Sequence, residues 1–295
     1  MKIGVIGAGK WGTALHFAFS RNREVKIFSR TPRDFPDFVT LNEILEMDYL
    51  VFAISTQSIA GWLKDNFKFK NQKILIASKG VDIESGRFLS QIFSDYVPEQ
   101  NIAFLSGPSF SSEVLNSLPT ALVINSRNYE LAEEWKNLFP DFIKAYTSSD
   151  IIGAEISGAY KNILAIASGV CEGLKLGNNA KASLVSRGLV EMARFGERFG
   201  GRKDTFLGLS GSGDLFLTAN STMSRNYRVG LGLAEGKNLN EILRDIGETA
   251  EGVKTVEAIQ KIREREGLYT PIADEVYKLL YSENTPLDAL KNLLN

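Results

Sequence analysis

Short apolar runs alternate with longer mixed segments through the first half of the chain. Six of these runs are rich in Val, Ile, Leu and Phe and are bounded by polar or turn-forming residues. Their length and their continuous apolar character predict parallel strands that are covered on both faces. The expected strands are residues 2–6, 25–28, 49–54, 74–78, 102–105 and 121–124.

Helical segments are expected after several of these strands. They are residues 13–19, 58–63 and 85–96. Alternation of strands and helices is typical of a doubly wound parallel sheet with helices on both faces. We therefore predict an α/β domain over residues 1–147.

From residue 148 onward the strand pattern disappears. Residues 150–169 are nearly apolar on more than one side, which predicts a buried helix, and residues 180–199 predict a second one. Thr270-Pro271 and Thr285-Pro286 each pair an N-cap hydroxyl with proline at the first helical position. We predict an all-helical second domain over residues 148–295. No flexible linker separates the two parts, so a cleft is expected at their boundary.

A glycine pattern follows the first expected strand. Residues 7–12 read Gly-Ala-Gly-Lys-Trp-Gly, with the spacing of a dinucleotide-binding turn between a strand and a helix. Gly7 would permit the tight turn, Gly9 the approach of a pyrophosphate, and Gly12 the packing of helix on strand. The pattern alone is weak, but its position between strand and helix favours a dinucleotide site.

Arg30 lies just after the second expected strand, and Arg33 is close by. NAD-specific sites often carry a carboxylate at this position, whereas an arginine accommodates the 2′-phosphate of NADP. We expect a preference for NADPH over NADH. A solvated arginine after a strand is the alternative.

Composition excludes several other classes. The 295 residues are 44% hydrophobic and carry 34 basic against 35 acidic side chains, so nothing indicates nucleic acid or a membrane surface as partner. No apolar stretch approaches a membrane span, and no leader is apparent, so we expect a cytoplasmic protein. Cys171 is the one cysteine and His16 the one histidine, which argues against disulfides, a metal site and a Ser-His-Asp triad.

Several polar groups interrupt these apolar patterns. Lys79 follows the fourth expected strand, and Lys161 lies within the apolar helix, where burial would lower its pKa toward neutrality. Asp214 follows a glycine-rich turn and could pair with Lys161. Arg225 and Asn226 offer donors that suit a phosphate or a carboxylate. Each residue alone is more typical of a surface ion pair or a cap, but together they predict a cationic substrate pocket.

These motifs together resemble the bacterial NAD(P)-dependent sn-glycerol-3-phosphate dehydrogenase family. Among them are Gly-Ala-Gly-Lys-Trp-Gly-Thr-Ala-Leu at 7–15, Ser-Gly-Pro-Ser-Phe at 106–110 and Leu-Ser-Gly-Ser-Gly-Asp-Leu at 209–215. The other matching segments are 78–80, 160–162, 177–182, 187–192, 224–226 and 251–255. The resemblance implies a Rossmann-type domain followed by a helical domain like that of 6-phosphogluconate dehydrogenase. It also implies reversible reduction of dihydroxyacetone phosphate to sn-glycerol 3-phosphate for glycerophospholipid synthesis. The cofactor would be NAD or NADP, and Arg30 is the reason to expect NADP.

The resemblance also implies a role for individual residues. Lys161 would donate the proton, Lys79 would contact substrate and cofactor, and Asp214 would orient Lys161, with Thr218 a weaker candidate. Further implied substrate contacts are Gly107, Ser109, Ser224, Arg225 and Asn226. Implied cofactor contacts are Gly7, Gly9, Lys10, Trp11, Gly12, Arg30, Lys79, Ser111, Arg225 and Glu251.

Two departures from the family pattern and two rival functions remain. Residues 31–48 form a shorter segment than the family usually has, without its Leu-Pro-Gly element, and Ser111 replaces the usual alanine.

A β-hydroxyacid dehydrogenase shares the two-domain layout and a lysine-centred mechanism. A sensor that binds NADPH without turnover is the rival from another class. The oligomeric state, a homodimer included, stays open.

Overall fold

The computed structural model describes residues 1–247, 250–282 and 284–294. The chain divides into two compact units, Met1–Ser78 with Phe88–Glu155 and Lys79–Arg87 with Ile156–Asn295. The chain finally passes from the first unit to the second inside helix α7 (Ile151–Gly173), whereas the sequence predicted the division at 147 and 148. The segment Lys79–Arg87, which follows the fourth strand, belongs to the second unit.

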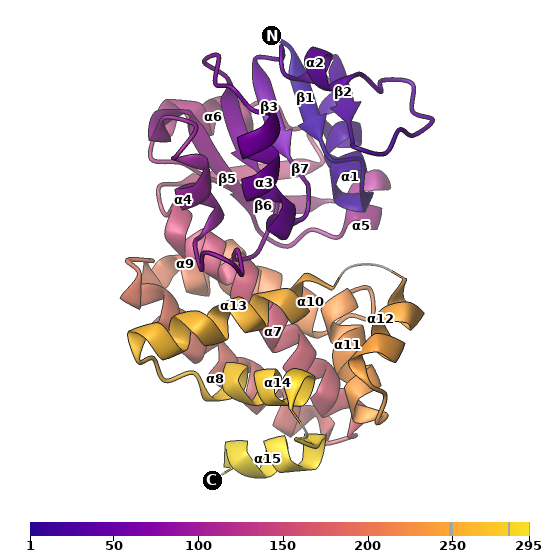
Figure 1. Cartoon of the computed structure of the whole chain (residues 1–295), viewed down its shortest axis with the longest axis vertical. Helices are drawn as coiled ribbons and strands as arrows, with labels where there is room; N and C mark the ends of the chain where they lie inside the picture. The colour runs from indigo at the N-terminus through magenta and orange to yellow at the C-terminus, as the bar shows by residue number, and fades with distance from the viewer. Residues whose placement is uncertain (248–249, 283, 295) are drawn as a thin grey trace. The chain divides into compact units, whose positions relative to one another are not determined.

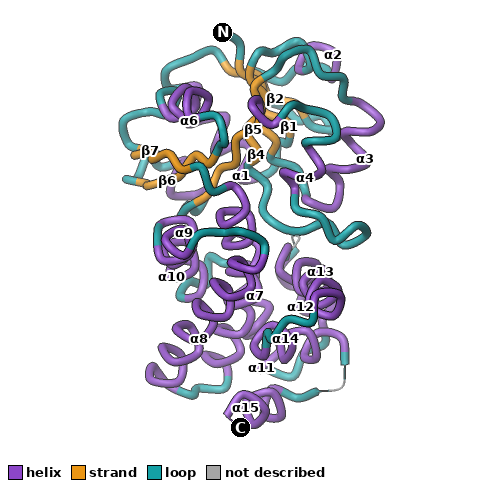
Figure 2. The backbone as a smooth tube through the Cα atoms, turned by 90° about the vertical axis from the view of Figure 1, so that its left-hand side faces the viewer, coloured by secondary structure: helices purple, strands orange, loops and turns teal. Residues whose placement is uncertain are grey.

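The first unit is built on one seven-stranded sheet, in the order β2-β1-β3-β4-β5-β6-β7. The strands are orange in Figure 2, and all neighbours are parallel except β5 and β6. Their bounds are β1 Ile3–Ile6, β2 Val25–Phe28, β3 Tyr49–Phe52, β4 Lys73–Ile76, β5 Ile102–Ser106, β6 Thr120–Asn125 and β7 Ile143–Ser148. The six predicted strands are confirmed in position, and no end differs by more than two residues.

The sequence did not predict β7. Its residues alternate between buried and exposed, with Lys144 and Tyr146 facing solvent, because it lies at the edge of the sheet. This alternation differs from the continuous apolar runs of the inner strands, so a search for such runs passes over it.

Six α-helices belong wholly to the first unit. They are α1 Lys10–Ser20, α2 Leu41–Ile44, α3 Thr56–Asn66, α4 Leu89–Phe93, α5 Ser111–Leu115 and α6 Tyr129–Lys136 (Figure 1). The helix predicted over residues 85–96 is wrong at its start. Ser85 instead closes a turn, donating its backbone N–H to Asp82 at 2.8 Å, and Gly86 follows with a φ of 64°. A left-handed residue cannot continue a helix.

Two apolar cores cover the two faces of the sheet. Phe19 and Trp135 are the large buried side chains of one core, and Phe52 and Phe93 are those of the other. Because successive strand residues point to opposite faces, continuous apolar strands can supply both cores. This double coverage confirms the doubly wound architecture.

Apart from Lys79–Arg87 and the connecting loops, the described residues of the second unit form helices. After α7 come α8 Gly177–Arg198, α9 Lys203–Leu207, α10 Asp214–Ala219, α11 Arg225–Ala234, α12 Leu239–Ile246, α13 Glu251–Glu266, α14 Pro271–Tyr281 and α15 Pro286–Leu294. Glycine allows α7 and α11 to cross closely, because a Cβ on Gly230 would lie 2.0 Å from the carbonyl oxygen of Ile166. None of the described helices meets the length and apolarity needed to span a bilayer.

The two predicted Thr-Pro helix starts differ in how they are capped. Pro271 is the first residue of α14 as expected, but the hydroxyl of Thr270 makes no cap hydrogen bond. The buried Glu191 of α8 replaces it, accepting from the backbone N–H groups of Ile272 at 2.8 Å and Ala273 at 3.0 Å. Thr285 does cap its helix, accepting from the backbone N–H of Asp288 at 3.2 Å.

Candidate active site

The glycine-rich turn of the first unit connects β1 to α1. Gly7 has a φ of 116°, and a Cβ there would lie 2.5 Å from the carbonyl oxygen of Ala53. A Cβ on Gly12 would lie only 1.8 Å from the carbonyl oxygen of Gly7, so the start of α1 requires glycine at this position. Gly9, by contrast, is exposed and has no atom within 4 Å of its Cβ position. Two of the glycines therefore close the turn and the third leaves space above it.

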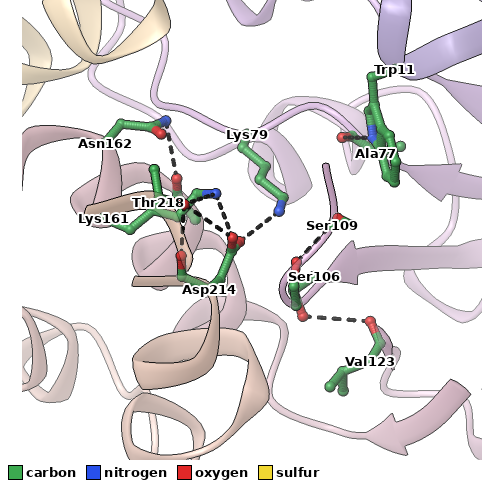
Figure 3. A network of polar contacts seen from close by, with 12 residues as sticks. Trp11, Ala77, Lys79, Ser106, Ser109, Val123, Lys161, Asn162, Asp214 and Thr218 are labelled. Atoms are coloured by element: carbon green, nitrogen blue, oxygen red, sulfur yellow. Dashed lines mark hydrogen bonds and ion pairs between the residues drawn. The ribbon is translucent and has the colours of Figure 1, made fainter. Parts of the chain in front are cut away.

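The N-terminus of α1 suits the pyrophosphate of a dinucleotide. Its N-cap is Gly9, so no side chain caps the first turn. The open space at Gly9 would let a phosphate approach the backbone amides, whose dipoles favour an anion. Trp11 is held beside this turn by donating its indole N–H to the carbonyl oxygen of Ala77 at 3.1 Å (Figure 3). Lys10 and Arg30 are exposed.

A second turn of the first unit holds three of the sequence-predicted residues. Gly107 follows β5, is buried and has a φ of 106°. The hydroxyl of Ser109 donates to the carbonyl oxygen of Gly107 at 3.2 Å, and Ser111 is the first residue of α5. The hydrogen bond and the left-handed glycine give this loop a defined conformation.

Asp214 joins two lysines in the second unit. Its Oδ1 lies 2.6 Å from Nζ of Lys161, and its Oδ2 lies 2.7 Å from Nζ of Lys79 (Figure 3). The side chains of the two lysines are 10% and 14% exposed and that of Asp214 is 2% exposed, so little water screens these pairs. The expected pairing of Lys161 with Asp214 is confirmed, and Lys79 shares the same carboxylate.

Burial and charge determine the protonation of this group. Burial lowers the pKa of Lys161 to about 8, although the charge of Asp214 counteracts this and that of Lys79 adds to it. Burial raises the pKa of Asp214, but the charges of Lys161 and Lys79 outweigh it, so the pKa lies below its usual value. Two lysines and one carboxylate leave a net positive charge, which favours an anionic ligand.

Local structure places both lysines against this carboxylate. Lys161 lies on α7, and Asp214 is the first residue of α10, directly after a π-helical turn at Leu209–Gly213. The aliphatic stem of Lys79 lies against Gly158, where a Cβ would be 3.3 Å from its Cγ. Thr218 donates to the backbone oxygen of Asp214 at 2.6 Å and lies 3.1 Å from Nζ of Lys161. Thr218, the weaker candidate for a substrate contact, therefore contacts this lysine.

The start of α11 holds the predicted anion-binding residues. Ser224 is the N-cap and accepts from the backbone N–H of Tyr227 at 3.2 Å. Arg225 is exposed and Asn226 is buried, and these are the first two residues of the helix. Asn226 reaches the start of α13, where its Oδ1 accepts from the backbone N–H of Gly252 at 3.0 Å. Burial lowers the pKa of Lys161, and the negative charge of Glu251 offsets a small part of that lowering.

Two residues near this group were not predicted. Gly158 and Gly252 carry no side chain, and the chemical patterns that single out lysines and carboxylates ignore them. Glycine in the interior of a helix costs about 1 kcal/mol relative to alanine. A glycine within a helical pattern is therefore the one local signal of a close contact that a Cβ would prevent. Among the described residues, no cluster of His, Cys, Asp or Glu could hold a metal ion.

Two family models match the chain. The model for the C-terminus of NAD-dependent glycerol-3-phosphate dehydrogenase matches residues 150–291, and the model for the N-terminus of the same enzyme matches residues 36–132. The glycine-rich turn precedes the second of these matches.

Known relatives match nearly the whole chain. Glycerol-3-phosphate dehydrogenase [NAD(P)+] of Sulfurimonas denitrificans is 58% identical over 294 residues, which cover 100% of this chain and 99% of the relative. The enzyme of that name from Campylobacter jejuni is 56% identical, with the same coverage. The crystal structure of glycerol-3-phosphate dehydrogenase from Coxiella burnetii is similar, with a TM-score of 0.91 and 30% identity, covering 100% of this chain and 98% of the other. The chain therefore belongs to the NAD-dependent glycerol-3-phosphate dehydrogenase family.

Proposed function

We propose that this protein reduces dihydroxyacetone phosphate to sn-glycerol 3-phosphate with Lys161 as the proton donor. The observation that carries this assignment is the buried Lys161–Asp214 ion pair, 2.6 Å long. Its lysine has a pKa of about 8, so the ammonium can give up a proton near neutral pH. The chain is an oxidoreductase that uses NAD or NADP, as its family membership shows.

The reduction requires a hydride and a proton. The reduced nicotinamide, when bound, supplies the hydride to C2 of the substrate, and the carbonyl oxygen develops negative charge. Lys161 gives its Nζ proton to this oxygen, so a C–H bond and an O–H bond form while the carbonyl π bond breaks. Asp214 holds the ammonium in place, and the positive charge of Lys79 stabilises the developing alkoxide.

The phosphate end of the substrate requires other donors. Arg225 supplies a guanidinium, which can form two parallel hydrogen bonds to phosphate oxygens. Asn226 supplies an amide, and the first turn of α11 supplies its backbone dipole. Ser224, Gly107 and Ser109 complete the proposed substrate contacts.

The dinucleotide would bind at the turn formed by Gly7, Gly9 and Gly12. The uncapped start of α1 and the open space at Gly9 support this position for the pyrophosphate. Arg30, exposed after β2, supports a preference for NADPH through the 2′-phosphate. Lys10, Trp11, Lys79, Ser111, Arg225 and Glu251 are the remaining proposed cofactor contacts.

The setting of the reaction is also part of the proposal. Family membership supports a supply of sn-glycerol 3-phosphate to phospholipid synthesis in the cytoplasm, and a homodimer is the assembly to test first. The measurement is the mass of the purified protein in solution.

The activity is tested by following NADPH oxidation with dihydroxyacetone phosphate. Lys161→Ala should lower kcat by roughly 10² to 10⁴, the usual contribution of a positioned general acid. NADPH affinity should stay near that of the wild type. Lys144→Ala, which removes an exposed lysine on β7, is the matched control and should be fully active.

Three results would overturn the proposal. Turnover by Lys161→Ala at the wild-type rate would show that Lys161 is not the proton donor. Activity on hydroxyacids but not on dihydroxyacetone phosphate would assign the chain to β-hydroxyacid chemistry. Binding of NADPH without turnover of either substrate would indicate a sensor.

A further inference from the structure

Gly252 contacts two helices at once. It is the second residue of α13, and its backbone N–H donates to Oδ1 of Asn226 on α11 at 3.0 Å. A Cβ at this position would lie 2.7 Å from that same Oδ1 and 3.0 Å from the carbonyl oxygen of Asn162 on α7. The first turn of α13 therefore packs against both α7 and α11 only because residue 252 has no side chain.

The space around Gly252, and not its backbone conformation, explains why glycine is needed. Gly252 does not have a positive φ, and it lies within a helix. One neighbour, the carbonyl oxygen of Asn162, belongs to the backbone of the buried helix α7, directly after Lys161. Real Cβ atoms essentially never approach another heavy atom as closely as 2.7 Å. A methyl group would therefore push α13 away or turn the amide of Asn226.

The hydrogen bond from Gly252 determines which way the amide of Asn226 faces. A backbone N–H can only donate, so the oxygen of the amide must face Gly252. The amide nitrogen, with its two N–H donors, then faces away from Gly252. Asn226 is 7% exposed, and a buried amide held in this way does not exchange the positions of its two ends.

We propose that Gly252 is a positioning residue that makes the enzyme selective for a phosphorylated substrate. It acts through Asn226, by holding the amide with its N–H donors presented to the phosphate. This inference rests on the proposed function, in which Asn226 binds that phosphate.

The test compares two ketones that share the C2 carbonyl. Dihydroxyacetone phosphate carries the phosphate and dihydroxyacetone does not. Gly252→Ala should lower kcat/KM for the phosphorylated ketone by roughly 10-fold to 100-fold, the range for loss of one hydrogen bond to a charged group. Most of the change should be in KM, and kcat/KM for dihydroxyacetone should stay within about twofold.

A double variant tests whether Gly252 acts through Asn226. Asn226→Ala should show the same selective loss as Gly252→Ala, and combining the two should cost no more than either alone. Asn226→Asp keeps an acceptor for the Gly252 N–H but removes the donors, so it should lose at least as much on the phosphorylated ketone. Gly61→Ala, at an exposed helical glycine with nothing within 4 Å of its Cβ position, is the control and should match the wild type.

The outcomes separate this inference from the proposed function. If Asn226→Ala leaves KM for dihydroxyacetone phosphate unchanged, the phosphate role of Asn226 fails and this inference fails with it. If Asn226→Ala is selective but Gly252→Ala weakens both ketones equally, or the two losses add, only this inference is overturned.

A folding defect would also be decisive. If Gly252→Ala does not fold, the double variant removes the contact with Oδ1, and it should fold and behave like Asn226→Ala. Failure of the double variant to fold would show that packing against Asn162 explains the glycine, and the positioning role would be wrong.

Discussion

The Nζ atom of Lys161 lies 2.6 Å from Oδ1 of Asp214, in surroundings that leave the carboxylate 2% exposed. A buried charge is costly unless a partner compensates for it. The carboxylate also compensates Lys79, whose Nζ lies 2.7 Å from Oδ2. One acidic side chain therefore allows two lysines to be buried at one place. Burial lowers the pKa of Lys161, and the charge of Asp214 keeps that pKa from falling as far as burial alone would take it.

The pH dependence of the reaction should follow the protonation of Lys161. Reduction needs the ammonium form, so kcat/KM for dihydroxyacetone phosphate should fall as the pH rises through about 8. Oxidation of sn-glycerol 3-phosphate needs the neutral amine, so its kcat/KM should rise through the same range. Initial rates in both directions over a pH series check this. Profiles that move in the same direction would contradict the assignment of the proton donor.

Asp214→Asn should shift the profile for reduction as well as slow the reaction. The charge of Asp214 raises the pKa of Lys161, so its removal lowers that pKa and moves the alkaline limb below pH 8. The amide can still accept a hydrogen bond, so part of the geometry is retained. The measurement is the pH series of kcat/KM for the variant. An unshifted limb would mean that Asp214 does not act on Lys161 electrostatically.

Arg30→Ala should weaken NADPH more than NADH. Loss of a charge-assisted hydrogen bond to the 2′-phosphate should raise KM for NADPH roughly tenfold, while KM for NADH changes little. Arg33→Ala, at a second exposed arginine of the same loop, is the comparison. Equal kcat/KM of the wild-type enzyme with NADPH and NADH would show that there is no preference to explain. A larger effect of Arg33→Ala would show that Arg33, and not Arg30, binds the 2′-phosphate.

Glu155 should make the stability of the protein depend on pH. Burial raises the pKa of its carboxyl from 4.5 to about 7, although hydrogen bonds from the backbone and hydroxyl of Ser90 counteract this. Because the folded pKa is the higher one, the native state holds a proton that unfolding releases between these two values. This contribution to the free energy of unfolding is present below pH 4.5 and falls by about 3 kcal/mol as the pH rises to about 7.

Glu155→Gln should remove this dependence. Urea unfolding at about pH 4 and about pH 8, on either side of the range from 4.5 to about 7, measures it for both proteins. Glu130→Gln, which replaces an exposed carboxylate on α6, should keep the wild-type difference. The same difference in Glu155→Gln as in the wild type would show that the buried carboxyl does not hold the proton.

Much of the fold could be predicted because it depends on neighbouring residues. Continuous apolar runs identified the six strands, and Gly7, Gly9 and Gly12 identified the turn after the first one. The helix that carries Lys161 was recognisable because residues 150–169 are apolar on more than one side, and a lysine among them is unusual. Strand β7 escaped because Lys144 and Tyr146 interrupt the apolar run at the edge of the sheet, where one face is in water.

The sequence by itself determined six of the seven strands, the glycine turn and the residue types that suit a phosphate-bearing ketone. Only the tertiary structure decided which of these residues meet. Lys79 reaches Asp214 across 135 positions, Glu191 replaces the cap expected from Thr270, and Gly252 orients Asn226. Hydrogen bonds within a turn of helix depend on local spacing, whereas these contacts depend on which helix faces pack together. That packing is a property of the whole core, and no short segment encodes it alone.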